Sequence, residues 1–263
     1  MKTKVNGIET NYEIHGKEGA PWLTFSHSLA CSVRMWDGQI AAFKDRWHIL
    51  VYDTRGHGAS EAPPGPYSLD MLAEDLRQLL EELKIKKTHY VGLSMGGMIG
   101  QVLALTDPGL FDRVVLADTG HAQTPETRKQ WQERIQTAET RGMQPLVQPT
   151  IERWFTAAFR DQPVVKKIAK LIGDTPVPGY VGCCHAIANL NTTARLKEIK
   201  RPVLAIAGEQ DTAAAGTRYI GENVPGARLV MLPNAAHIAN IEQEEAFNRA
   251  LREFLSSPAS AKA

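Results

Sequence analysis

The sequence predicts an α/β fold, in which a mostly parallel sheet carries helices on both faces. β-rich runs alternate with helical patterns from residue 22 to residue 117, and the alternation resumes at residue 203. Such alternation is typical of a parallel sheet covered on both sides by helices. In between, residues 120–198 contain helical patterns separated by prolines and no convincing strand. We therefore predict a core of residues 1–119 and 199–263, with residues 120–198 inserted as a helical cap.

Local patterns define the expected elements. The Asn6-Gly7 pair between two short strand-like runs predicts an N-terminal hairpin with a two-residue turn. The expected core strands are residues 22–26, 47–52, 88–93, 113–117, 203–207 and 228–232. The expected core helices are residues 35–43, 69–83, 95–106, 217–223 and 245–255. In the cap, helical patterns cover residues 131–138, 150–159 and 164–171.

Length and charge limit the partners that the chain can have. Its 263 residues suit one large α/β domain with an insertion better than two unrelated full-sized domains. The 30 lysine and arginine residues nearly balance the 29 aspartate and glutamate residues, which gives a net charge of +1. This balance gives no electrostatic reason to expect nucleic acid or an anionic membrane as a partner. We therefore expect a small-molecule ligand.

Neither targeting segments nor disulfides are expected. Residues 1–15 lack the apolar stretch of a signal peptide, and no segment approaches the roughly 18 apolar residues that span a bilayer. We therefore expect a cytoplasmic protein. The cysteines are odd in number and two of them, Cys183 and Cys184, are neighbours, so reduced thiols are expected. Cys31 is a conceivable nucleophile, but a small buried apolar residue is the better interpretation.

The strongest motif is the pentapeptide Gly92-Leu93-Ser94-Met95-Gly96, which lies between an expected strand and an expected helix. A G-x-S-x-G motif in this context raises a nucleophilic serine on a tight turn at the end of a strand, and the glycines leave room for the strand and helix to approach. Taken alone the motif is weak, since about one random chain in ten of this length would contain it. Its context makes Ser94 the predicted nucleophile.

A serine nucleophile needs a histidine base and an acid, and with this motif they follow in the chain order serine, acid, histidine. Asp211 lies just after an expected strand, and His237 follows the next one, where the carboxyl ends of parallel strands meet. We predict these two residues as partners of Ser94. Asp118 is the chief rival for the acid because it also follows a strand, and Glu209 is a lesser one.

The oxyanion that forms during ester cleavage needs hydrogen-bond donors. We nominate the backbone N–H of Met95, next to the nucleophile, and that of Leu29, in the loop after the strand of residues 22–26. Ser28 is the alternative to Leu29. The histidines show no metal-ligand spacing, so neither a metal nor a cofactor is expected, and His57 is interpreted as part of the architecture of its loop.

The sequence resembles the 3-oxoadipate enol-lactone hydrolases of aromatic catabolism. The resemblance covers nearly the whole chain and is carried by residues 26–29, 35–37, 52–60, 64–68, 92–97, 154–156, 179–184 and 235–240. The serine motif and the Arg55-Gly56-His57-Gly58 turn are shared by many α/β-hydrolases, so they indicate the fold more than the substrate. The two cap segments, residues 154–156 and 179–184, are more specific.

The resemblance implies an α/β-hydrolase fold with a helical cap over the site and a triad of Ser94, Asp211 and His237. It also implies a serine hydrolase that opens an ester or lactone through an acyl-enzyme, with 3-oxoadipate enol-lactone or a related lactone as substrate. The sequence departs from the family in two places. Residues 212–215 lack the usual proline, and residues 189–191 read Asn-Leu-Asn where an acidic residue is common, so the exact lactone stays open.

Several side chains are candidates for binding the substrate. Arg34, just beyond the oxyanion loop, is a candidate cation for an anionic lactone, with a surface arginine as the alternative. Trp36, Trp131 and Trp154, with Phe159, are candidates to line an apolar pocket under the cap, with ordinary packing as the alternative.

Other functions remain compatible with the same triad. A general carboxylesterase and a C–C bond hydrolase differ from a lactonase only in the pocket, and substrate profiling separates them. A small-molecule receptor that keeps the triad would show slow or single turnover. A haloalkane dehalogenase is disfavoured, because that chemistry needs a carboxylate at the position of Ser94. The sequence leaves the oligomeric state open.

Overall fold

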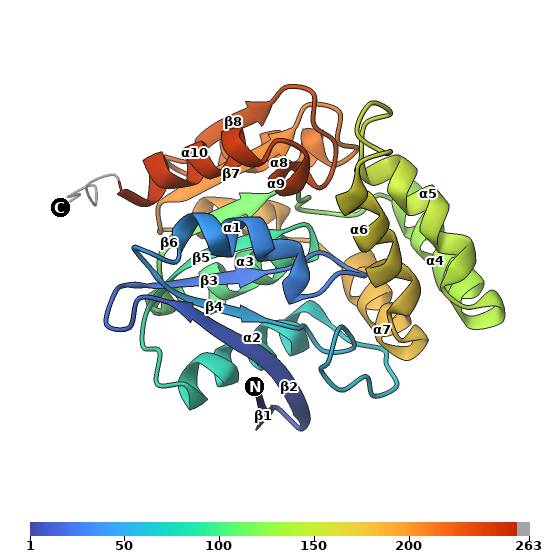
Figure 1. The fold of residues 1–263 in the computed structure, drawn as a ribbon, viewed down its shortest axis with the longest axis horizontal. Coiled ribbons are helices and arrows are strands. Elements are labelled where there is room, and N and C mark those ends of the chain that lie inside the picture. Colours follow the sequence, from blue (N-terminus) through green and yellow to red (C-terminus); the bar gives the residue numbers. More distant parts are fainter. Residues whose placement is uncertain (257–263) are drawn as a thin grey trace.

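A computed structural model describes residues 1–256, which form one eight-stranded sheet (Figure 1). The strand order is β1-β2-β4-β3-β5-β6-β7-β8, with β2 antiparallel to β1 and β4 and every other pair parallel. The strands are β1 (Lys2–Val5), β2 (Ile8–Gly16), β3 (Trp22–Ser26), β4 (His48–Tyr52), β5 (Thr88–Leu93), β6 (Phe111–Ala117), β7 (Val203–Gly208) and β8 (Arg228–Leu232). The predicted mostly parallel sheet is confirmed; residues 257–263, assigned to the core from sequence, lie outside the described range.

The N-terminal hairpin forms at the predicted Asn-Gly pair. Val5 pairs with Ile8, and the turn residues Asn6 and Gly7 have φ angles of 45° and 79°. Both angles are positive, as a type I′ turn requires, and asparagine and glycine tolerate them best. The Asn6 side chain donates to Asp75 Oδ1 at 2.6 Å, which ties the hairpin to the helix that carries Asp75.

Helices cover both faces of the sheet (Figure 1). The first and last helices, α1 and α10, pack against each other, as do α2 and α3. In α10, Phe247, Leu251 and Phe254 are buried at the spacing of one helical face. The core helices are α1 (Asp37–Phe43), α2 (Leu69–Glu82), α3 (Met95–Thr106), α8 (Ala214–Asn223), α9 (Ala239–Glu242) and α10 (Glu244–Ser256), with the 3-10 helices η1 (Val33–Trp36) and η2 (Pro108–Leu110).

The segment between β6 and β7 is helical and gathers at one end of the sheet (Figure 1). It contains α4 (Pro125–Arg141), α5 (Gln144–Trp154), α6 (Pro163–Asp174), α7 (Val177–Ala188) and the 3-10 helix η3 (Thr193–Glu198). Within the described residues, its only β pairing is an isolated bridge between Ala122 and Asn191. We refer to residues 120–198 as the cap.

Two features of the cap differ from the sequence expectation. The α5 helix ends at Trp154, five residues before the expected end at residue 159, because Phe155 adopts an extended conformation. The α7 helix was not expected, since Gly179 and Gly182 weaken its helix propensity. Its buried face outweighs that weakness. Pro163 and Pro178 were expected to lie between the cap helices. Both lie instead in the first turn of a helix, where the missing backbone N–H has little cost.

Glycines bring the cap helix α7 into direct backbone contact with the core. A Cβ atom on Gly179 would lie 2.0 Å from the carbonyl oxygen of Gly56, and one on Gly65 would lie 2.8 Å from the Cα of Gly182. Next to this contact, the Cys183 thiol donates to the Arg55 carbonyl at 3.7 Å. The core loop that begins at Arg55 and the cap helix therefore form one packed unit.

A buried carboxyl group joins the carboxyl ends of β6 and β7. Asp118 follows β6, and its Oδ1 accepts the N–H of Gly208 at 2.9 Å. Burial raises the pKa of Asp118 well above its usual range, and the charge of Asp211 raises it further. Its Oδ2 has no hydrogen-bond partner among residues 1–256. Burial therefore favours the protonated form of Asp118 in the folded protein.

Replacing Gly179 by alanine should loosen the contact between α7 and the core. We expect Gly179→Ala to lower the free energy of unfolding by about 1–3 kcal/mol, because overpacking outweighs the better helix propensity of alanine. Gly109→Ala is the matched control, since its Cβ would meet nothing closer than 3.6 Å. Urea unfolding of both variants checks this; equal stability of the two would contradict the proposed close contact.

Asp118 should make stability fall as the pH rises from about 4 towards neutrality. The carboxyl group loses its proton near pH 4 in the unfolded chain, whereas burial raises the pKa of Asp118 well above its usual range in the folded protein. Above that pH the unfolded state binds fewer protons, so linkage lowers the free energy of unfolding. Asp118→Asn removes this effect, and the variant should gain stability relative to wild type between about pH 4.5 and 7.

Urea unfolding at about pH 4.5 and at about pH 7 measures the stability difference between wild type and Asp118→Asn. Asp45→Asn, at an exposed position, serves as the control. A constant difference between wild type and Asp118→Asn across this range would show that Asp118 is ionised in the folded protein.

Candidate active site

Ser94 lies at the strained turn that connects β5 to α3. Its backbone angles are φ 55° and ψ −113°, a conformation that L residues rarely adopt. Small neighbours allow the turn, since a Cβ on Gly92 would lie 2.3 Å from the Gly96 carbonyl oxygen, and a Cβ on Gly96 would lie 2.2 Å from that of Ser26. The turn holds the Ser94 side chain at the carboxyl end of the sheet.

The structure brings the three predicted triad residues into one hydrogen-bonded chain. Ser94 Oγ lies 2.9 Å from His237 Nε2, and His237 Nδ1 lies 2.9 Å from Asp211 Oδ1. In this arrangement Nδ1–H donates to the carboxylate, which leaves Nε2 free to accept the serine proton. Asp211 follows β7 and His237 follows β8, so adjacent strand ends supply both residues. The arrangement can activate a hydroxyl as a nucleophile.

The two rival acids do not contact His237. Asp118 is turned towards the Gly208 N–H, and Glu209 is exposed. Asp211 Oδ1 accepts from His237 and also from the Ala213 N–H at 3.0 Å, and its side chain is fully buried. The geometry therefore favours Asp211, as the sequence predicts.

The two nominated oxyanion donors flank the serine. Leu29 lines the same cavity as Ser94, and Met95 follows Ser94 at the N-terminus of α3. Among residues 1–256, neither backbone N–H has a hydrogen-bond acceptor. An N–H at the first turn of a helix has no intrahelical acceptor, so Met95 is free to bind an anion. The role of both groups stays a prediction.

A cavity of about 280 Å³ lies over Ser94 and His237, between the core and the cap. Trp131 on α4 and Trp154 on α5 line it, as predicted from sequence, and the Trp154 ring lies 5.9 Å from that of His237. Ser28, Leu29 and Ala30, from the core, also line it. A small ligand in this cavity would contact the serine and both tryptophans.

Two predicted substrate-binding residues are away from the cavity, so those predictions need correction. Trp36 is fully buried and its ring packs 4.8 Å from that of Phe25, because the short η1 helix turns it into the core. Arg34, on the same helix, points outwards and pairs with Glu13 and with Asp37. Neither of them lines the cavity. Phe159 stacks on Phe155 and is also absent from its walls.

Sequence reasoning missed both arginines that line the cavity, Arg134 and Arg153. The Arg134 guanidinium lies 4.3 Å from the centre of the Trp131 ring, and Arg153 reaches Thr150 Oγ1 at 3.4 Å. Burial, followed by the charge of Arg134, lowers the pKa of Arg153 to about 10. Neither arginine has an acidic partner within the described range. The spacing of Trp131 and Arg134, three residues apart on one helix, was the available signal.

Other possible reactive groups are inert or absent in the described part of the chain. The three cysteines are free and buried, and burial raises the pKa of the Cys31 thiol, so it is a poor nucleophile. Over residues 1–256, no group of three or more histidine, cysteine, aspartate or glutamate residues is arranged to hold a metal ion. None of the helices in that range has the length and hydropathy to cross a bilayer.

Comparison with known proteins agrees with the fold and the site. Residues 21–244 match the model of the alpha/beta hydrolase fold family. The chain is 40% identical to 3-oxoadipate enol-lactonase 2 of Acinetobacter baylyi over 93% of its own length and 92% of the relative, and 32% identical to 3-oxoadipate enol-lactonase 1 of that organism over 98% and 97%.

Among solved structures, the enol-lactonase from Burkholderia xenovorans LB400 superposes with a TM-score of 0.94 at 39% identity, covering 98% of this chain and all of that one. The resemblance identified from the sequence motifs is therefore confirmed. With its strained serine turn at the carboxyl end of a mostly parallel sheet, the chain belongs to the α/β-hydrolase fold family and is an enol-lactonase-like hydrolase.

Proposed function

We propose that the protein opens the ring of an anionic enol-lactone, 3-oxoadipate enol-lactone or a related lactone of aromatic catabolism, through Ser94, His237 and Asp211. The observation that carries the proposal is the hydrogen-bonded chain of these three residues beneath a cavity that also contains two arginines without acidic partners. The similarity to relatives named 3-oxoadipate enol-lactonases supports the same substrate.

In the proposed first step, His237 Nε2 takes the proton of Ser94 as Oγ attacks the lactone carbonyl carbon. The N–H groups of Leu29 and Met95 donate to the oxyanion that develops. When the tetrahedral intermediate collapses, the ring C–O bond breaks and the enol oxygen receives the proton from His237. Because the leaving group is part of the same molecule, it stays attached to Ser94 through the acyl chain.

In the proposed second step, a water molecule loses a proton to His237 and attacks the acyl carbon. The ester bond to Ser94 then breaks, and Oγ recovers its proton from His237. The enol released by ring opening tautomerises to a ketone, which makes the overall reaction strongly downhill. Asp211, hydrogen-bonded at 2.9 Å, stabilises the imidazolium that forms in both steps.

The pair of arginines supports an anionic substrate. Arg134 and Arg153 lie in the cap wall of the cavity, and burial first, then repulsion by the charge of Arg134, lower the pKa of Arg153. A substrate carboxylate would relieve that repulsion and accept charge-assisted hydrogen bonds from the guanidinium groups. The rings of Trp131 and Trp154 would contact its apolar part.

The alternatives use the same triad with different substrates. A general carboxylesterase would not need two cations in the pocket, and a C–C bond hydrolase would cleave a vinylogous diketone. A receptor that retains the triad would turn over slowly or once. Multiple-turnover assays on 3-oxoadipate enol-lactone, a neutral aryl ester and a vinylogous diketone distinguish these functions.

Replacing Ser94 by alanine should abolish hydrolysis of the enol-lactone. We expect Ser94→Ala to lower kcat by about 10⁵–10⁶-fold, because the variant lacks the nucleophile. The thermal midpoint should stay close to that of wild type, since the side chain lies at the cavity and an alanine methyl group fits the same space. If Ser94→Ala kept full rate on all three compounds of the panel, the proposed nucleophile would be wrong.

Replacing Arg153 by methionine should weaken binding of anionic substrates only. Loss of a charge-assisted hydrogen bond should raise KM for the enol-lactone by about 10–100-fold, with a smaller change in kcat. KM for a neutral aryl ester should stay within about twofold. Arg34→Ala is the matched control, because Arg34 pairs with Glu13 outside the cavity and should leave both KM values unchanged. Equal effects of Arg153→Met on charged and neutral substrates would exclude this role.

A further inference from the structure

Two buried histidines that the proposed reaction does not use flank the loop of Leu29. His27 follows β3, and His57 lies in the loop after β4; both side chains are fully buried, and their rings are 5.3 Å apart. Neither histidine lines the cavity. Every ring nitrogen of the two has a backbone group within hydrogen-bonding distance.

The backbone fixes the protonation of both rings. The Thr54 N–H donates to His27 Nε2 at 2.9 Å, and the Ala30 N–H donates to His57 Nε2 at 2.9 Å. A nitrogen that accepts a hydrogen bond carries no proton, so each neutral ring has its proton on Nδ1. Accordingly, His27 Nδ1 lies 2.7 Å from the Ser28 carbonyl oxygen, and His57 Nδ1 lies 3.2 Å from that of Arg55.

The bond from His27 acts on the peptide group that carries the nominated oxyanion donor. The Ser28 carbonyl and the Leu29 N–H belong to the same peptide unit, so a donor on the oxygen fixes the direction of the N–H. It also polarises the peptide, which strengthens the N–H as a donor. The Cys31 N–H donates to the same oxygen at 3.2 Å, so that this carbonyl is held from two sides.

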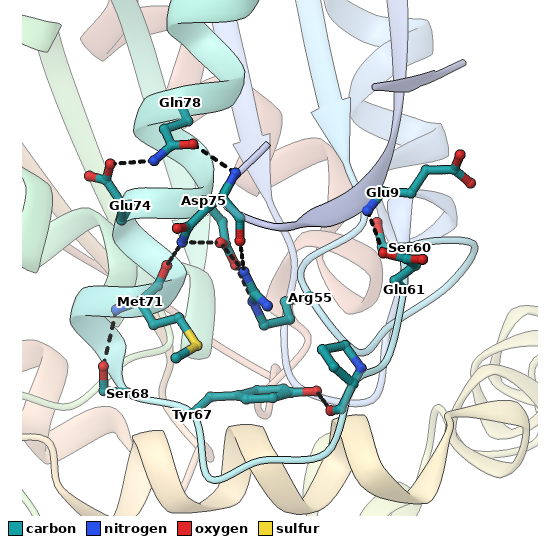
Figure 2. Close-up of polar contacts among 12 residues, drawn as sticks. Glu9, Arg55, Ser60, Glu61, Tyr67, Ser68, Met71, Glu74, Asp75 and Gln78 are labelled. Atoms are coloured by element: carbon teal, nitrogen blue, oxygen red, sulfur yellow. Dashed lines mark hydrogen bonds and ion pairs between the residues drawn. The ribbon is translucent and has the colours of Figure 1, made fainter. Parts of the chain in front are cut away.

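The bond from His57 holds the next peptide group. Ala30 has a φ of 56°, a conformation that is costly for alanine. The His57 ring supplies an acceptor for the Ala30 N–H and thereby stabilises this turn. The loop of His57 is itself anchored, because the Arg55 guanidinium makes two hydrogen bonds to the Asp75 carboxylate, at 2.6 and 2.8 Å (Figure 2). Asn6, from the N-terminal hairpin, contacts the same carboxylate.

We infer that His27 and His57 are positioning residues for the oxyanion hole, and that as neutral Nδ1–H tautomers they clamp the peptide groups on either side of Leu29. This inference rests on the proposed function, since it assigns a purpose to the Leu29 N–H. Burial lowers the pKa of both rings, that of His57 to about 3, which keeps them neutral in the range where the triad acts.

The first test needs no substrate. A two-bond ¹H–¹⁵N spectrum of the wild-type protein labelled with ¹⁵N-histidine should show neutral Nδ1–H tautomers for His27 and His57 at neutral pH, in addition to the Nδ1–H of His237. Loss of one signal in His27→Asn and of the other in His57→Gln assigns them. An Nε2–H tautomer or an imidazolium at either residue would overturn the inference, because the ring could then not accept the backbone N–H.

The second test separates positioning from a purely structural role. His27→Ala removes the donor to the Ser28 carbonyl, whereas the side-chain amide introduced by His27→Asn can place an N–H near the position of Nδ1. We expect His27→Ala to lower kcat for the enol-lactone about 10–100-fold with little change in KM, since the oxyanion forms only in the transition state. His27→Asn should recover at least half of the loss on a logarithmic scale.

Thermal midpoints show whether each His27 variant folds, and Ser94→Ala serves as the control for the proposed function. An unchanged kcat in folded His27→Ala, or a loss of kcat in His27→Asn as large as in His27→Ala, would overturn the positioning role. If His27→Ala does not fold, His27→Asn and the tautomer spectrum still decide, because a kcat within about tenfold of wild type is expected for His27→Asn. Should wild type fail to turn over the lactone, or Ser94→Ala retain activity, the proposed function fails instead, and the tautomer result stands separately.

Discussion

The close approach of α3 to β3 is the constraint on which the site depends. The Gly96 backbone lies against that of Ser26, at a distance that leaves no room for a Cβ atom. The chain can reach this position only through a sharp turn at Ser94, which adopts a positive φ as a result. Two hydroxyl groups hold the turn: Tyr90 donates to the Gly96 carbonyl at 2.5 Å, and Thr119 donates to that of Ser94 at 2.8 Å. The strain at Ser94 is therefore balanced by buried hydrogen bonds.

This approach also places the oxyanion loop. Because β3 ends beside the first turn of α3, the loop that follows Ser26 lies next to the Met95 N–H. Its conformation is then fixed by groups from the loop after the neighbouring strand, through the ring of His57 and the Thr54 N–H. One backbone contact thus sets the positions of the nucleophile and of both candidate oxyanion donors.

The cap and the histidine loop are held by one buried carboxylate. Glu242 Oε2 accepts the Ala236 N–H at 2.8 Å, directly before His237, and Oε1 accepts the Thr156 N–H at 2.9 Å in the cap. The Ile238 N–H donates to the Trp154 carbonyl at 3.2 Å. Ile238 therefore contacts the cap segment that carries Trp154 directly, and Ala236 is linked to it through Glu242, so the position of the base depends on the cap.

The core and its motif were predictable because each depends on local pattern. Alternating apolar runs define the strands, and Gly92 and Gly96 signal the turn at Ser94 without reference to distant residues. The cap was harder, since the α7 helix depends on burial against Gly56 and not on its own propensity. The direction of a side chain could not be predicted either. Whether Trp36 faces the core or the cavity depends on the short η1 helix, which is too short to show a hydrophobic periodicity in the sequence.

The charges of the site are separated in a way that suits an anionic substrate. Asp118 and Asp211 are neighbouring carboxyl groups, of which Asp211 contacts His237, and a substrate carboxylate would be repelled if both were ionised. Burial raises the pKa of Asp118 and so disfavours its charged form, and Asp211 Oδ1 is paired with His237. Both cationic residues lining the cavity, Arg134 and Arg153, lie on the cap side. An anionic lactone would therefore orient its carboxylate towards the cap and its carbonyl towards Ser94, because the reverse orientation would bring two negative charges together.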